Sequence, residues 1–249
     1  MKYVLWVLFL LLVGCSSSLP QALSPSEESL ARAAQLNAQL GMEYLKNGNI
    51  GKAKHKLLLA LKQDSKSPEV LGAMGYFQEH TGNFTAAQSY YSKALQVSGS
   101  SGTSHNNYGA FLCRQGQYQA SLSHFIAATQ DPNYLTPGEA FENAGLCAEQ
   151  IPNLSLAKRY FRRAVENNPQ LVRSLLELAQ LYYWQNNNSQ ALKYFHRYEQ
   201  LGNLTPKALF LGIKIYQKAG KMKIAQHYEQ LLKTNYSDSK EYKQRVSNN

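Results

Sequence analysis

The sequence predicts an all-α protein, a right-handed solenoid of six stacked helix pairs with a charged C-terminal cap. Small residues recur with a period of about 34 residues, and one step is slightly longer. Five positions before each small residue stands a turn residue, and four positions after it, in five of the six copies, stands an aromatic residue or leucine. The recurring small residues are Ala53, Ala87, Ser121, Ala157, Ala191 and Ala225.

Each copy has the residue pattern of two antiparallel helices. A glycine or alanine on the first helix and the small residue on the second let the two helices approach closely, and one pair alone buries too little apolar surface to be stable. The pattern resembles the tetratricopeptide repeat, a unit of two helices in about 34 residues. The resemblance implies repeats near residues 34–67, 68–101, 102–135, 138–171, 172–205 and 206–239.

The sixth repeat departs from this pattern. Ile213 and Glu229 stand where glycine and an aromatic residue are expected, and this predicts a cap, as terminal repeats often are. Residues 206–249 carry nine Lys or Arg and three acidic residues, a net charge of +6. We therefore expect this end of the solenoid to present a charged, solvated face.

The N-terminal segment, 1–14, has the features of an export signal. Lys2 precedes a run of ten apolar residues, 4–13, which is shorter than the roughly 20 needed to span a bilayer. The sequence Leu12-Val13-Gly14-Cys15 resembles a bacterial lipobox, which implies cleavage after Gly14 and a lipid on Cys15. The alternative is an ordinary secretory signal that ends in a cysteine by chance.

A lipid on Cys15 would anchor the protein to a membrane, and no other cofactor is expected. Ser16 rather than Asp follows the cysteine, and by the sorting rules of enteric-type bacteria this implies the outer membrane, facing the periplasm. Residues 15–23 are then the lipidated end and a flexible tether. Ser24 followed by Pro25 predicts a capped helix start, so the repeat domain is expected over 24–249.

The composition and motifs favour a binding protein over an enzyme. The chain has 249 residues, of which 44% are hydrophobic, so it is too apolar to be disordered. Its net charge of +10 would suit nucleic acid, but an exported lipoprotein rarely meets any, so no nucleic acid is expected as a partner. The six histidines share no face of the repeat, and no phosphate loop or serine nucleophile motif is present, so we expect neither a metal nor a small-molecule substrate.

Two cysteines, Cys113 and Cys147, remain after Cys15. An even number of cysteines in an oxidising compartment favours a disulfide. In the repeat frame they lie on the first helices of the third and fourth repeats, which are neighbours in a solenoid, but a bond also needs Cα atoms within about 7 Å. The competing hypothesis is a lipid-anchored thiol hydrolase in which one of the two cysteines is unpaired and reactive.

The concave groove of the solenoid is the expected binding site. Apolar and aromatic residues with a nearby cation suit a partner helix or an extended peptide better than a small polar substrate. The fourth repeat differs from the others, because it places Glu139, Glu142 and Glu149 at groove positions. The alternative is that the apolar side chains only pack against neighbouring helices. The predicted contact residues are Met42, Leu45, Leu176, Tyr183 and Trp184.

The third and fourth repeats carry a more specific pattern: residues 106–118 read NNYGAFLCRQGQY and residues 142–147 read ENAGLC. With the lipobox and the repeats, they resemble the PilF/PilW family of type IV pilus biogenesis lipoproteins over essentially the whole mature chain. The resemblance implies an outer-membrane pilotin that binds secretin subunits and promotes their localisation and ring assembly, or a protein that stabilises the pilus. The alternative is a general periplasmic scaffold that recruits cell-wall hydrolases or outer-membrane assembly factors.

Overall fold

The computed structural model describes residues 26–201 and 204–247. These residues form thirteen α-helices and contain no strand. The first helices of the pairs are α1 (Glu27–Lys46), α3 (Pro68–His80), α5 (Gly102–Arg114), α7 (Pro137–Ala148), α9 (Val172–Trp184) and α11 (Pro206–Lys218). The second helices are α2 (Ile50–Gln63), α4 (Phe84–Val97), α6 (Tyr118–Gln130), α8 (Leu154–Asn167), α10 (Asn188–Leu201) and α12 (Met222–Asn235), and α13 (Lys240–Ser247) follows.

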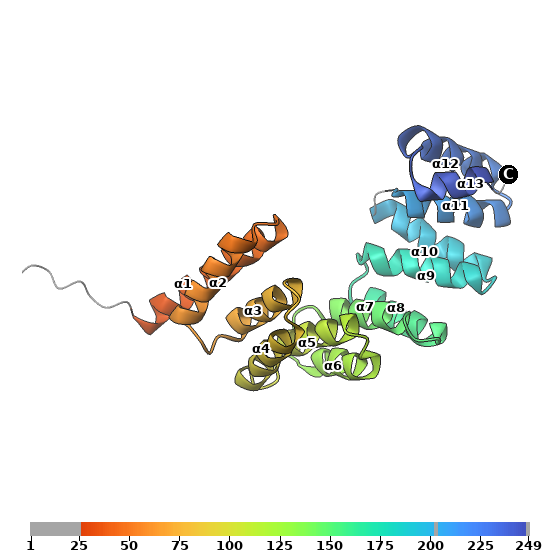
Figure 1. Ribbon diagram of the computed structural model, residues 1–249. Helices are drawn as coiled ribbons and strands as arrows, with labels where there is room; N and C mark the ends of the chain where they lie inside the picture. The colour runs from red at the N-terminus through yellow and green to blue at the C-terminus, as the bar shows by residue number, and fades with distance from the viewer. Residues whose placement is uncertain (1–25, 202–203, 248–249) are drawn as a thin grey trace, which may run out of the picture.

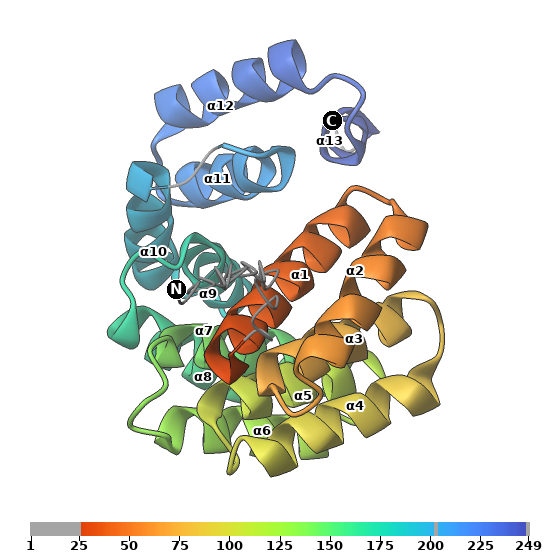
Figure 2. The ribbon, with the colours of Figure 1, turned by 90° about the vertical axis from the view of Figure 1, so that its left-hand side faces the viewer.

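The helix pairs stack side by side along a curved path from α1 to α13 (Figure 1). In the view of Figure 2, α3, α5, α9 and α11 lie on the inside of the curve, and α4, α6, α10 and α12 lie on the outside. Successive first helices pack against each other, α1 on α3, α3 on α5 and α5 on α7. The first helices therefore form the concave side, and the predicted all-α solenoid is confirmed.

Close packing within each pair depends on residues with little or no side chain. The recurring small residues of the second helices are fully buried. On the facing first helix, a Cβ at Gly145 would lie 2.6 Å from the ring of Phe161, and a Cβ at Gly109 would lie 3.0 Å from the ring of Phe125. Glycine thus lets each aromatic ring lie directly on the backbone of the first helix. Ser121, the one polar residue in the small set, donates a hydrogen bond to the carbonyl of Gly109 at 2.8 Å.

The sixth repeat keeps this packing one residue out of register. A Cβ at Gly212 would lie 2.6 Å from the rings of both Phe195 and Tyr228. Gly212 and Tyr228 therefore take the roles that the repeat frame assigned to Ile213 and Glu229. The sixth repeat therefore keeps the glycine–aromatic contact, although Ile213 and Glu229 occupy the positions of the regular frame.

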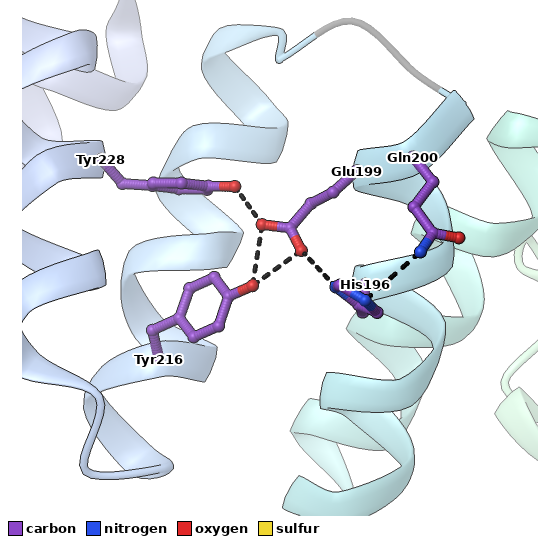
Figure 3. Close-up of polar contacts among 5 residues, drawn as sticks. All are labelled: His196, Glu199, Gln200, Tyr216 and Tyr228. Atoms are coloured by element: carbon purple, nitrogen blue, oxygen red, sulfur yellow. Dashed lines mark hydrogen bonds and ion pairs between the residues drawn. The ribbon is translucent and has the colours of Figure 1, made fainter.

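A partly buried carboxylate joins the last two repeats (Figure 3). Glu199 of α10 accepts hydrogen bonds from the hydroxyls of Tyr216 on α11, at 2.7 and 2.8 Å, and of Tyr228 on α12. His196 Nδ1 lies 3.2 Å from the same carboxylate. Burial, and then the hydrogen bond to Glu199, raise the pKa of both tyrosines. Three helices are thereby fixed to one another through a single side chain.

The two ends of the fold differ from the sequence predictions. The N-cap of α1 is Ser26, whose side chain accepts a hydrogen bond from the backbone NH of Ser29 at 3.2 Å, so the predicted cap, Ser24, lies two residues too early. Ser24, Cys15 and the signal segment lie outside the described residues. At the other end, α13 was not predicted; it packs against α11, and its Arg245 pairs with Glu229. Within the described part of the chain, no helix is long and apolar enough to cross a membrane.

Candidate protein-binding groove

A cavity of about 800 Å³ lies between α1 and α3 on the concave side. Two of the predicted contact residues line it: Met42 is half-buried, and Leu45, only 3% exposed, also packs in the core. Ala73 and Tyr76 of α3 form part of the opposite wall. The remaining lining residues are mostly polar: Gln35, Ala38, Gln39, Glu43, Lys46, Glu69 and His80.

The α3 wall of this cavity was missed by the sequence analysis, although the signal was present. The groove positions that gave Met42 in the first repeat correspond to Tyr76 in the second. Tyr76 is 40% exposed, and the guanidinium of Arg114 lies 6.0 Å from the centre of its ring. Arg114 is itself held by Glu79 through two hydrogen bonds of 2.6 and 2.8 Å. Tyr76 therefore brings an aromatic ring to the cavity wall, and the ion pair of Arg114 and Glu79 lies beside that ring.

The middle of the concave side is acidic. Glu142 accepts hydrogen bonds from the backbone NH and the hydroxyl of Ser174, at 3.0 and 2.7 Å. Glu177 pairs with Lys207 at 2.7 Å. Glu149 lies near this pair, and its burial, together with the negative charge of Glu177, raises its pKa to about 7. The groove thus contains a carboxylate that is only partly ionised near neutral pH.

Replacing Glu149 with glutamine is expected to stabilise the protein at pH 8 more than at pH 5. Because the pKa of Glu149 is raised to about 7, its contribution to stability is complete below about pH 4.5 and is lost as the pH rises through 7. A neutral glutamine avoids that loss, so we expect the melting temperature to rise by roughly 1–3 °C at pH 8. Thermal melts followed by circular dichroism at both pH values measure this. An equal rise in melting temperature at both pH values would contradict the raised pKa of Glu149.

The C-terminal end of the concave side combines aromatic rings with lysines. Tyr183 and Trp184 line a cavity of about 350 Å³ between α9, α11 and α13, and Trp184 is 54% exposed. Lys218 Nζ lies 4.5 Å from the centre of the Tyr183 ring, and Lys214 Nζ lies 4.0 Å from that of Phe210. The predicted combination of aromatic residues and cations is therefore present at this end.

The prediction that Leu176 contacts a partner in the groove is wrong, because its side chain is not at the groove surface. Its side chain is 8% exposed and belongs to the core that extends from α6 to α12. A helical position that faces the groove in one repeat is covered here by the packing of the neighbouring helices. Leu176 therefore supports the concave wall and does not offer a contact surface to a partner.

The structure joins Cys113 of α5 to Cys147 of α7 in a disulfide, with the Cα atoms 5.8 Å apart. Cys147 is fully buried, and its Sγ lies 3.3 Å from the hydroxyl oxygen of Ser121. In this state neither sulfur is a thiolate, so the thiol-hydrolase hypothesis has no nucleophile. The bond instead ties the third repeat to the fourth.

Two histidines lie in contact, although their positions in the repeat predicted no common face. His105 of α5 and His124 of α6 lie with their Nδ1 atoms 2.9 Å apart, so one ring donates a hydrogen bond to the other. Burial lowers the pKa of both. Their repeat positions differ, but antiparallel helices of one pair bring them together. In the part of the chain that the structure describes, no group of three or more His, Cys, Asp or Glu is arranged to hold a metal ion.

A repeat solenoid whose concave side is apolar at one end, acidic in the middle and aromatic and basic at the other is a protein-binding scaffold. The tetratricopeptide-repeat family model matches residues 38–104 and 153–206. The type IV pilus assembly protein PilF of Pseudomonas aeruginosa is 30% identical over 233 residues, which cover 94% of this chain and 92% of PilF. The chain belongs to the PilF/PilW family of tetratricopeptide-repeat proteins of type IV pilus biogenesis.

Solved structures agree with this relationship. A structure from the functional characterisation of P. aeruginosa PilF has a TM-score of 0.78 at 30% identity and covers 88% of this chain and 99% of its own. PilW, described as a widely conserved type IV pilus biogenesis factor, has a TM-score of 0.73 at 29% identity, covering 86% and 98%. MamA, at 18% identity and a TM-score of 0.53, shares the fold alone.

Proposed function

We propose that this protein supports type IV pilus biogenesis by binding a pilus protein in its concave groove. The observation that carries the proposal is the match to PilF, which extends over 94% of the chain and so includes every repeat that forms the groove. The groove offers surfaces for recognition, and the function needs no catalytic group. A cavity lined by both apolar and polar side chains suits an amphipathic helix or an extended segment with alternating apolar side chains.

The finer role that we propose is that of a pilotin for the secretin. A lipid on Cys15 would carry the protein and its bound client to the periplasmic face of the outer membrane, as the lipobox and Ser16 predict. Tethering would also raise the local concentration of bound secretin subunits at the membrane where their ring forms. Anchor and groove thus supply transport and recognition within one chain.

Deletion of the gene tests this role. We expect the high-mass secretin ring to disappear from a non-boiled gel of outer membranes, together with surface pili, and both to return with the wild-type gene. Complementation with Cys15→Ala measures the requirement for the anchor. Intact rings without pili would indicate that the protein stabilises the pilus and is not needed for the secretin ring. Intact rings with normal pili would refute the pilus role and leave a scaffold for other periplasmic proteins.

Within the groove, Met42→Glu is expected to weaken binding of the secretin's periplasmic domains by at least about tenfold, since it replaces an apolar lining residue with a charge. Met42 is half-buried and lines the cavity, so the change acts on the contact surface and leaves the deeper core intact. Leu58→Glu is the matched control, because Leu58 is 51% exposed on α2, outside the cavity lining. Biolayer interferometry measures the affinity of both variants. Unchanged affinity for Met42→Glu would show that the partner does not bind at this cavity.

A further inference from the structure

The second helix of the fourth repeat carries four cations on one face. Lys158, Arg159, Arg162 and Arg163 of α8 are spaced one and four residues apart, which places them side by side on a helix. Together with Glu166 they line a depression of about 360 Å³. We call these four cations the basic face. In the view of Figure 2, α8 lies farther from the inside of the curve than the neighbouring α9. The two cavities of the concave side are lined by residues of other helices, so the basic face lies apart from them.

The charges of the basic face are largely uncompensated. Among the described residues, its one ion pair joins Arg162 to Glu166 at 3.7 Å, with both side chains more than half exposed. Lys158 donates a hydrogen bond to the neutral Gln185 at 2.6 Å. The guanidinium of Arg163 lies 4.2 Å from the centre of the Phe141 ring. The face therefore keeps a net positive charge that no part of the described chain neutralises.

The neighbouring helix extends this positive surface. Burial and then the neighbouring Tyr182 raise the pKa of Tyr194 on α10, while the charges of Arg162 on α8 and Arg197 on α10 lower it. Arg197 lies 5.8 Å from the centre of that ring. Tyr194 is only 9% exposed, so the cations rather than this ring form the surface.

We propose that the basic face docks on a bilayer that contains anionic phospholipids. Cations along one exposed helix can reach a flat surface at the same time, whereas cations inside a concave groove cannot. The choice of a membrane over an acidic protein rests on the lipid anchor of the proposed function, which would hold this face near a bilayer. Docking would then fix the orientation of the solenoid on the membrane and leave its groove free for the client.

The test uses the mature chain with Cys15→Ser, so that no acyl chain contributes. The vesicles are either pure phosphatidylcholine or phosphatidylcholine mixed seven to three with the anionic phosphatidylglycerol. We expect the protein to float with the anionic vesicles only, and we expect salt at about 0.5 M to weaken this binding. Each charge near an anionic surface changes the affinity about fivefold. Arg159→Gln with Arg162→Gln should therefore weaken binding by roughly tenfold or more, and both residues changed to Glu should abolish it.

The double variant leaves the Lys158 hydrogen bond and the Arg163 stacking in place, and melting curves verify that it folds. Lys223→Gln with Lys233→Gln, on exposed positions of α12, removes the same net charge and should leave vesicle binding unchanged. Equal loss in both variants, or equal binding to neutral vesicles, would overturn the proposal. Binding to polyglutamate without binding to vesicles would assign the face to an acidic protein instead. None of these outcomes bears on the gene-deletion test of the pilus role, so the two proposals fail independently.

Discussion

Gly145→Val is expected to lower the free energy of unfolding by about 3 kcal/mol or more. A Cβ at this position would lie 2.6 Å from two atoms of the Phe161 ring, and the ring itself is fully buried. A rigid, enclosed ring cannot rotate away, so α7 and α8 must separate to admit the new side chain. Because each repeat is stabilised by its neighbours, the damage should reach the adjoining repeats as well.

Gly51→Ala is the control for this substitution. Gly51 lies in the first turn of α2, and a Cβ there would meet nothing within 4 Å. Alanine is a better helix former than glycine, so this variant should be unchanged or more stable by up to about 1 kcal/mol. Urea unfolding curves compare the two variants with the wild type. A Gly145→Val protein within about 1 kcal/mol of the wild type would show that the helix pair does not depend on this close approach.

The repeat period predicted the positions of the helices well, because the two helices of every repeat pack in the same way. First helices begin at Pro68, Gly102, Val172 and Pro206, as the repeat boundaries predicted, and at Pro137 for a predicted 138. The period predicts less at the ends, where no further repeat follows. The helix α13 is short and strongly polar, and only its contacts with α11 and the pairing of Arg245 with Glu229 show why it forms.

Contacts between side chains of different helices were the part that the sequence could not supply. His105 and His124 occupy unlike repeat positions, and Glu199 meets two tyrosines from two other helices. Such pairings depend on rotamers and on the crossing of helices, neither of which the period encodes. The groove shows the same limit: Met42 lines the cavity as predicted, whereas Leu176 is covered by the core.

Replacing both Cys113 and Cys147 with alanine is expected to lower the free energy of unfolding by about 3.7 kcal/mol in the chain-entropy model. The disulfide links residues 34 apart in the sequence and joins α5 to α7, which also pack against each other. Its loss lets the unfolded chain explore more conformations and removes the one disulfide in the described part of the chain. Urea unfolding of the double variant, with and without reductant, measures the effect.

The wild type in reductant provides the matched comparison, since it loses the bond but keeps both sulfur atoms. It should fall to a stability close to that of the double variant, and reductant should leave the variant itself unchanged. Labelling of the unfolded, unreduced protein should find no free thiol on Cys113 or Cys147. Two free thiols would refute the bond, and the third and fourth repeats would then be held together by non-covalent contacts, as the other neighbouring repeats of the described chain are.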